Sequence, residues 1–125
     1  AETLLNLRRR EPIEHTKDSV KIYKKTIRGH NNVMTVDVAK GRGQDYSTFN
    51  LIDISTNPFE QVAVYRNNTI SPLLFPNVIY KYAEFYNQCI VVIESNDAGQ
   101  VVCNGLYFLS NSYLKLLIIL FEVFI

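Results

Sequence analysis

The sequence predicts a mixed α/β sheet, in which three antiparallel strands are followed by a helix, a parallel strand and a second helix. Three consecutive stretches are rich in β-branched and aromatic residues and are joined by short connections. The apolar period then changes from two to about 3.6, and a run that is apolar on both faces follows. The 125 residues form one domain at most, which buries a core without needing disulfides.

The three antiparallel strands are expected at residues 33–39, 47–55 and 60–66, with the sequences "VMTVDVA", "STFNLIDIS" and "EQVAVYR". The connections "KGRGQD" and "TNPF" are too short for a crossover, so that neighbouring strands must run antiparallel. A shorter strand is expected in "SVKIY", and Pro12 ends any helix that begins in the residues before it.

Two helices and a buried strand are expected in the second half of the chain. Apolar residues at helical spacing predict a helix over 71–88, which Ser71 and Pro72 would begin. The run "CIVVIE" at 89–94 is apolar on both faces, as a strand in the middle of a sheet is. After the break "SNDAG", the segment 100–108 predicts the second helix.

Charge divides the chain into two parts. Residues 1–30 carry eight Lys/Arg against four Asp/Glu, and residues 31–125 carry five against eight, although the whole chain has a net charge of only +1. A basic segment before a slightly acidic body is typical of a chain that touches nucleic acid beside an acidic site. A solvated linker that is basic by chance explains the same distribution, so that charge leaves both interpretations open.

The cysteine and histidine residues do not indicate a metal site. Cys89 and Cys103 lie in or beside apolar runs without a close-spaced partner, which is typical of buried free thiols in a reducing compartment. No pair among these two residues, His15 and His30 has the spacing of zinc ligands.

The apolar run "YLKLLIILFEVFI" near the C-terminus raises the question of a membrane span. The run is shorter than a bilayer requires, and Lys115 and Glu122 interrupt it. A buried strand or helix is therefore expected, with an interfacial segment as the alternative. The N-terminal arginines follow the nearby apolar residues, which is not the order of a secretory signal. No membrane partner is expected.

Two carboxylates lie inside apolar strands, where aspartate is disfavoured. Asp37 lies between Val36 and Val38, and Glu94 ends the run "IVVI". Burial of an unpaired carboxylate is costly, so each needs a partner or a function. If their strands are parallel and adjacent, the carboxylates meet at the carboxyl edge of the sheet, where α/β proteins bind ligands. Converging carboxylates with few basic neighbours favour Mg²⁺ or Mn²⁺.

The glycine hairpin supplies a third candidate. With Gly41 as its centre, Asp45 would pair opposite Asp37 and be a ligand or a partner of one. Capping of a glycine turn is an equally good explanation of Asp45. Asp53 has a similar local pattern but lies at the opposite end of its strand, so that we expect it to face solvent.

The sequence "GRG" is expected to form a hairpin turn rather than a phosphate cradle. A dinucleotide-binding loop needs a third glycine and a helix directly afterwards, whereas "YSTFNLI" continues as a strand. The Lys-Ser/Thr that ends a Walker motif is also absent. Arg42 would be free to reach a phosphate from this turn.

Three segments resemble a known family. "VMTVDVAKGRGQDYSTFNLIDIS", "EQVAVYRNNTIS" and "YNQCIVVIESNDAG" are similar to the C-terminal nuclease domain of the large terminase subunit of myovirus-type tailed phages, the motor that packages and cuts concatemeric DNA. The likeness includes the pattern D-x-x-x-G-R-G-x-D-Y and a later I-E-x-N-x-x-G. It implies a ribonuclease H-like fold, here C-terminally incomplete, and metal-dependent cleavage of double-stranded DNA.

The resemblance also implies roles for individual residues. Asp37 resembles the metal ligand of the first strand, and Glu94 resembles the carboxylate that ends the fourth strand. Asp45 matches the acidic residue of the glycine hairpin, where substitution is expected to harm cleavage. The expected cofactor is Mg²⁺ or Mn²⁺. The family carries a third carboxylate beyond the last residue of this chain, so that feeble or no cleavage is expected here unless Glu122 replaces it.

Contacts with DNA are expected from four basic residues, namely Arg42, Lys40, Lys24 and Lys25. The resemblance divides the chain into a linker from an upstream ATPase domain (1–19), a partial nuclease domain (20–107) and a divergent apolar tail (108–125). It implies partnership with that ATPase domain and with portal or other packaging proteins, in the host cytoplasm.

Two other functions remain as alternatives. A non-catalytic DNA-binding or motor-docking module would rely on the basic N-terminal segment. An actin-like ATP-binding domain also uses an aspartate-containing hairpin, but it needs small hydroxyl residues soon after the aspartate and a second glycine-rich phosphate loop, which this sequence lacks.

Overall fold

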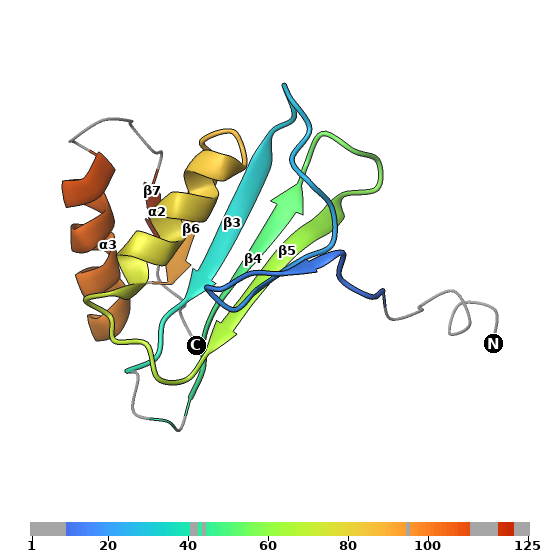
Figure 1. Ribbon diagram of the computed structural model, residues 1–125. Helices are drawn as coiled ribbons and strands as arrows, with labels where there is room; N and C mark the ends of the chain where they lie inside the picture. Colours follow the sequence, from blue (N-terminus) through green and yellow to red (C-terminus); the bar gives the residue numbers. More distant parts are fainter. Residues whose placement is uncertain (1–9, 41–42, 44, 95, 111–117, 122–125) are drawn as a thin grey trace, which may run out of the picture.

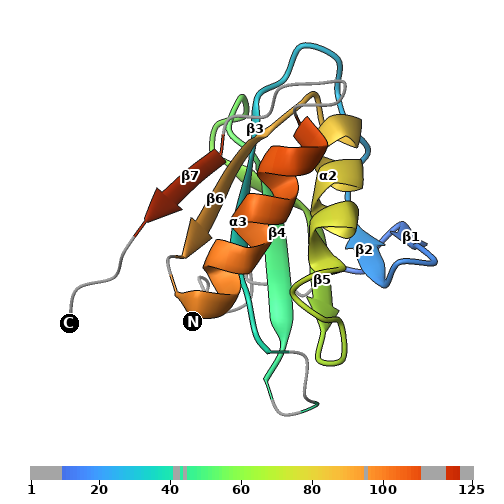
Figure 2. The same cartoon turned by 90° about the vertical axis from the view of Figure 1, so that its left-hand side faces the viewer.

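The computed structural model describes residues 10–40, 43, 45–94, 96–110 and 118–121. In this part of the chain, two helices cover one face of a sheet of seven strands (Figures 1 and 2). The helices are α2 (Phe75–Phe85) and α3 (Asp97–Ser110). The strands are β1 (Glu14–His15), β2 (Val20–Ile22), β3 (Asn32–Asp37), β4 (Ser47–Asp53), β5 (Glu60–Asn67), β6 (Ile90–Glu94) and β7 (Ile118–Phe121).

The order of the strands across the sheet is β1-β2-β5-β4-β3-β6-β7. The predicted meander is confirmed, since β4 pairs antiparallel with both β3 and β5. The predicted parallel strand is also confirmed, since β6 lies beside β3 and runs in the same direction. Strand β1 was not expected, because it lies in the segment interpreted as a linker. Strand β7 lies in the apolar run for which a buried strand or helix is expected, and it pairs with β6. The predicted mixed α/β sheet is therefore correct.

The core lies between the sheet and the two helices. Side chains alternate along β3, so that Met34 and Val36 are buried while Thr35 and Asp37 are exposed. An aromatic stack joins the sheet to α2, because the ring of Tyr65 lies 5.2 Å from that of Phe49 and 5.3 Å from that of Phe75. Full burial of each such side chain stabilises the fold by about 1.5–3 kcal/mol.

Helix α2 is shorter than the sequence predicts at both ends. Residues from Ser71 form a separate turn, in which the Ser71 side chain accepts a hydrogen bond from the Leu73 amide at 3.1 Å. The helix itself begins at Phe75, where Pro76 occupies the first turn, a position that tolerates proline. At the other end, Asn87 and Gln88 have positive φ angles of 63° and 53°, which cannot continue a right-handed helix.

Helix α3 begins earlier than predicted and packs closely against α2. Its first residue is Asp97, inside the segment that we expected to be a break. The two helices approach each other at Gly105, where a Cβ atom would lie 2.6 Å from Cγ of Pro76. Within the described residues, neither helix is long and apolar enough to cross a bilayer.

The prediction that Asp53 faces solvent is wrong. Asp53 is 2% exposed and lies on the helix side of the sheet. Its Oδ2 accepts a hydrogen bond from Nδ1 of His30 at 2.7 Å, and its Oδ1 accepts one from the Ser55 amide at 2.9 Å. The alternation of β4 puts Asp53 on the same face as Phe49 and Leu51, which the local pattern "LIDIS" does not reveal.

Candidate functional site

Asp37 and Glu94 end adjacent parallel strands on the face of the sheet that the helices do not cover. Val36 of β3 pairs with Ile93 of β6, and both are buried toward the helices. Successive side chains of a strand point to opposite faces, so the next residue of each strand lies on the open face. Asp37 and Glu94 both line a cavity of about 240 Å³, together with Thr35, Thr48 and Asn50.

The turn after β6 explains the pattern I-E-x-N-x-x-G. Oδ1 of Asn96 accepts a hydrogen bond from the Gly99 amide at 2.7 Å, which caps the first turn of α3. A Cβ atom at Gly99 would lie 2.2 Å from the main-chain oxygen of Glu94. Glycine therefore allows the helix to start directly beside the end of β6, and this close approach positions the main chain of Glu94.

The hairpin between β3 and β4 is held by polar contacts at its base and to the residue after β5. Ser47 is 1% exposed, and its hydroxyl accepts a hydrogen bond from the Ala39 amide at 2.9 Å. Gly43 has a φ of +81°, and its amide donates to the main-chain oxygen of Asn68 at 2.9 Å. These contacts tie the hairpin to the end of β5, next to the two carboxylates.

The predicted pairing of Asp45 with Asp37 is wrong. Asp37 pairs with Thr48 and not with Asp45. Asp45 precedes β4 and is exposed. A shift of register in a hairpin follows from the conformation of its turn, which glycine spacing alone does not specify.

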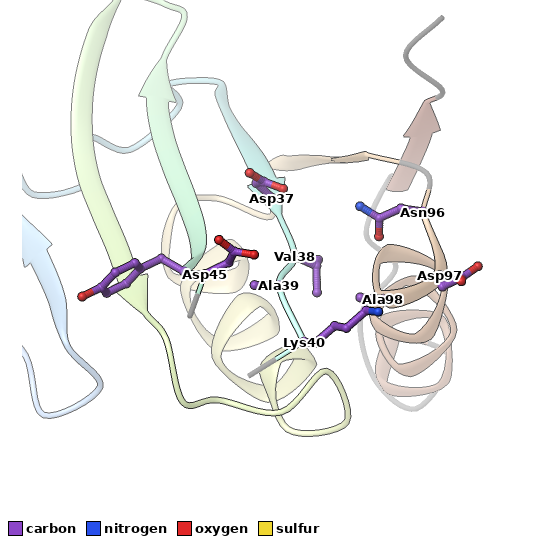
Figure 3. Close-up of a pocket in the computed structure, with 9 residues that line it drawn as sticks. Asp37, Val38, Ala39, Lys40, Asp45, Asn96, Asp97 and Ala98 are labelled. Atoms are coloured by element: carbon purple, nitrogen blue, oxygen red, sulfur yellow. The ribbon is translucent and has the colours of Figure 1, made fainter. Parts of the chain in front are cut away.

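Asp45 nevertheless lies at the same end of the sheet as Asp37. Both line a cavity of about 680 Å³ that extends from the hairpin to the first turn of α3. In Figure 3, Lys40 extends from the hairpin toward Ala98 on that helix. Asp97 also lines this cavity, but its side chain points away from Asp37 and Asp45 in the same view.

The structure places the predicted DNA-contacting residues in different regions. Lys40 lines the larger cavity, whereas Arg42 lies outside the described residues. Nζ of Lys24 lies 3.2 Å from Oε2 of Glu60, at the end of β5 remote from the carboxylates. Lys25 is exposed beside it. The structure therefore does not bring Lys24 and Lys25 to the candidate site.

Arg66 is a residue near the site that we did not select from the sequence. Thr48 pairs with Asp37 on one side and with Arg66 on the other, so the three side chains form one row across the open face. The guanidinium of Arg66 lies 3.8 Å from the ring centre of Tyr46. Alternation in "VAVYR" puts Tyr65 and Arg66 on opposite faces of the sheet, and Tyr65 is buried. This alternation is the sequence signal that could have identified Arg66.

The donor set at the two cavities is rich in oxygen. Across the part of the chain that the structure describes, the three ion pairs involve Lys24, His30 and Lys81, and none involves Asp37, Asp45 or Glu94. Within the same residues, no group of three His, Cys, Asp or Glu converges as a complete metal site. Mg²⁺ commonly binds through one or two carboxylates, with water and substrate phosphates as its other ligands. The residues present fit such a cation.

Comparison with known proteins identifies related folds. The large terminase nuclease of thermophilic phage G20c with bound magnesium superposes with a TM-score of 0.73 and 18% identity, covering 92% of this chain and 56% of that one. The same nuclease with bound cobalt gives a TM-score of 0.73 and 17% identity, covering 92% and 55%. The Thermus phage P74-26 large terminase nuclease domain gives a TM-score of 0.65 and 19% identity, covering 90% and 53%.

The chain thus spans little more than half the length of these nucleases, and at this identity the likeness establishes the fold. A sequence model of the terminase RNase H-like domain matches residues 34–113, which include most of β3, all of β4 to β6, both helices and the two strand-ending carboxylates. The match covers more than half of the chain and starts within the strand that bears Asp37. The chain belongs to the terminase RNase H-like domain family.

Proposed function

We propose that this chain is part of a phage DNA-packaging nuclease that cuts double-stranded DNA with the help of Mg²⁺ or Mn²⁺. The observation that carries the proposal is the position of Asp37 and Glu94, which end neighbouring parallel strands and line one cavity on the open face. Two structures of the related nuclease of phage G20c contain magnesium and cobalt, respectively, which agrees with a divalent cofactor.

Asp37 and Glu94 would hold the cation through their carboxylate oxygens. A divalent cation bound there supplies an activated water and stabilises the leaving oxygen of a phosphodiester. The uncharged neighbours Thr35, Thr48 and Asn50 leave room for substrate without competing for the cation as charged ligands. Asp45 and Lys40 line the adjoining cavity, where a carboxylate and an ammonium group orient water and phosphate.

In the whole protein, we expect this domain to follow an ATPase domain and to work with portal or other packaging proteins in the host cytoplasm. The division into a linker at 1–19, a nuclease domain at 20–107 and a tail at 108–125 stays part of this proposal. The proposed catalytic residues are Asp37, Glu94 and Asp45. The proposed DNA contacts are Arg42 and Lys40.

Metal binding tests this function even where cleavage is slow. Titration of Mn²⁺, followed by the loss of the free-ion electron paramagnetic resonance signal, should show saturable binding. Asp37→Asn and Glu94→Gln should each weaken binding at least about tenfold, because each removes one charged ligand. Asp97→Asn is the matched control, since its side chain points away from Asp37 and Asp45, and binding should stay unchanged.

Plasmid nicking is the second measurement. We expect feeble conversion of supercoiled to open-circular DNA that requires Mg²⁺ or Mn²⁺ and disappears in Asp37→Asn. Cleavage in the presence of excess chelator, or equal Mn²⁺ affinity in all variants, would contradict the proposal. Salt-sensitive DNA binding in the double variant Asp37→Asn/Glu94→Gln, without any metal effect, would instead favour the non-catalytic DNA-binding module.

A further inference from the structure

The open face of the sheet has an uneven distribution of charge. Asp37 and Glu94 lie at its β3 and β6 side, whereas Arg66 of β5 and exposed Lys21 of β2 lie at the other side. Lys21 pairs with Val64, two residues before Arg66, so that both basic side chains project from the same face. Uncharged Thr48 and Asn50 separate the two sides.

Arg66 is positioned by an aromatic ring and not by a carboxylate. Its guanidinium lies 3.8 Å from the ring centre of Tyr46, which is itself 41% exposed. No carboxylate of the described residues lies within the 4.0 Å of an ion pair with it. A guanidinium held over an aromatic ring can still offer its N–H groups to a planar or tetrahedral anion.

We propose that Arg66, held by Tyr46, binds a backbone phosphate of double-stranded DNA beside the position of the scissile phosphate. This inference rests on the proposed nuclease function and extends it to Arg66, which the sequence patterns did not single out. The occupant is a duplex DNA strand that crosses the open face from β5 toward β3.

Geometry and charge support this occupant. Arg66 and Asp37 lie in one row with Thr48 between them, so their main chains are two strand spacings, or about 10 Å, apart. A duplex strand advances about 3.4 Å along its axis for each nucleotide, so phosphates near the scissile one come within reach of a long arginine side chain. A bidentate arginine contact also fixes the orientation of a phosphate, which a solvated lysine does not.

The experiment measures duplex binding without cleavage. Fluorescence anisotropy of a short labelled duplex is recorded with chelator over a series of salt concentrations, using the chain itself and its Arg66→Ala variant. Arg66→Ala should lower affinity about tenfold at low salt and reduce the slope of log affinity against log salt by about one. Arg28→Ala is the matched control, because Arg28 is exposed between β2 and β3, at the opposite end of the sheet, and both quantities should stay unchanged.

Three further variants separate the effect of charge from the effect of stacking. Arg66→Lys should keep the salt slope but bind more weakly, because lysine retains the charge and loses the fork of donors. Tyr46→Leu should likewise weaken binding with the slope retained, whereas Tyr46→Phe, which keeps the ring, should bind as the unmodified chain does.

The inference would be overturned if Arg66→Ala and Arg28→Ala had the same duplex affinity and the same salt dependence of that affinity. It would also be overturned if the unmodified chain did not bind the duplex. A lower unfolding midpoint of Arg66→Ala with unchanged DNA binding would assign the Tyr46–Arg66 pair a purely structural role and overturn it too. Because this experiment contains no metal and the Mn²⁺ titration contains no DNA, failure of one is distinguishable from failure of the other.

Discussion

Asp37 and Asp53 both lie at strand ends among apolar neighbours, but their surroundings differ. Asp37 is exposed at the open face, whereas Asp53 is buried and hydrogen-bonded to His30 and to the Ser55 amide. Burial by itself raises the pKa of Asp53, but the hydrogen bond from His30 and the one from Ser55 outweigh it, so that the pKa lies below its ordinary value. Because its pKa is lowered, the ionised form of Asp53 stabilises the fold.

The pKa shift of Asp53 gives a prediction about acid stability. A depressed pKa contributes stability that is complete above the unfolded value, near 3.8, and is lost as the pH falls through the lower folded value. Asp53→Asn should therefore lower the free energy of unfolding by about 2 kcal/mol at neutral pH and by less below about pH 3. Urea unfolding across this pH range checks it, with Glu11→Gln, an exposed carboxylate, as the control. A difference that stays constant with pH would contradict the assigned role of the carboxylate.

At the scale of elements, the start of α3 depends on Gly99. A methyl group there would lie 2.2 Å from the main-chain oxygen of Glu94, which is closer than a Cβ atom approaches an oxygen, and so β6 or α3 must move. Gly99→Ala should lower the free energy of unfolding by about 1–3 kcal/mol, despite the better helix propensity of alanine. It should also weaken Mn²⁺ binding, because Glu94 moves with the end of β6.

Gln100→Ala is the control for Gly99→Ala, because Gln100 is the exposed next residue of the same helix. The Gln100→Ala variant should keep a stability and a Mn²⁺ affinity close to those of the unmodified chain. Thermal unfolding and the Mn²⁺ titration measure the two effects separately. If Gly99→Ala bound Mn²⁺ with full affinity, the turn would not position Glu94.

At the scale of the whole molecule, Cys89 reports the opening of the sheet. Cys89 is 3% exposed and directly precedes β6, and burial raises the pKa of its thiol to about 12. In a Cys103→Ser background, an aromatic disulfide reagent should label Cys89 at least about 1000-fold more slowly in buffer than in concentrated urea, because labelling needs opening of the core. The rate of release of the coloured thiolate measures this. Labelling at nearly the unfolded rate would show that the sheet opens locally at β6.

The sequence alone determined most of the strands, both helices and the antiparallel pairing within the meander. Alternation in β3, β4 and β5, and connections too short for a crossover, predicted the meander, and the doubly apolar run at β6 predicted a parallel strand. The same local patterns singled out Asp37 and Glu94, because a carboxylate in an apolar strand stands out in any sequence.

Only the tertiary structure decided the register between strands, the face of the sheet on which a side chain lies, and the contacts between residues distant in the sequence. Asp37 pairs with Thr48, which leaves Asp45 outside the ladder of β3 and β4. Asp53 is buried because His30, which lies 23 residues earlier in the chain, completes its hydrogen bonds, and Arg66 joins the row of Asp37 only through Thr48. Local propensity reports the conformation of a few neighbouring residues, whereas these contacts depend on how whole strands align across the sheet.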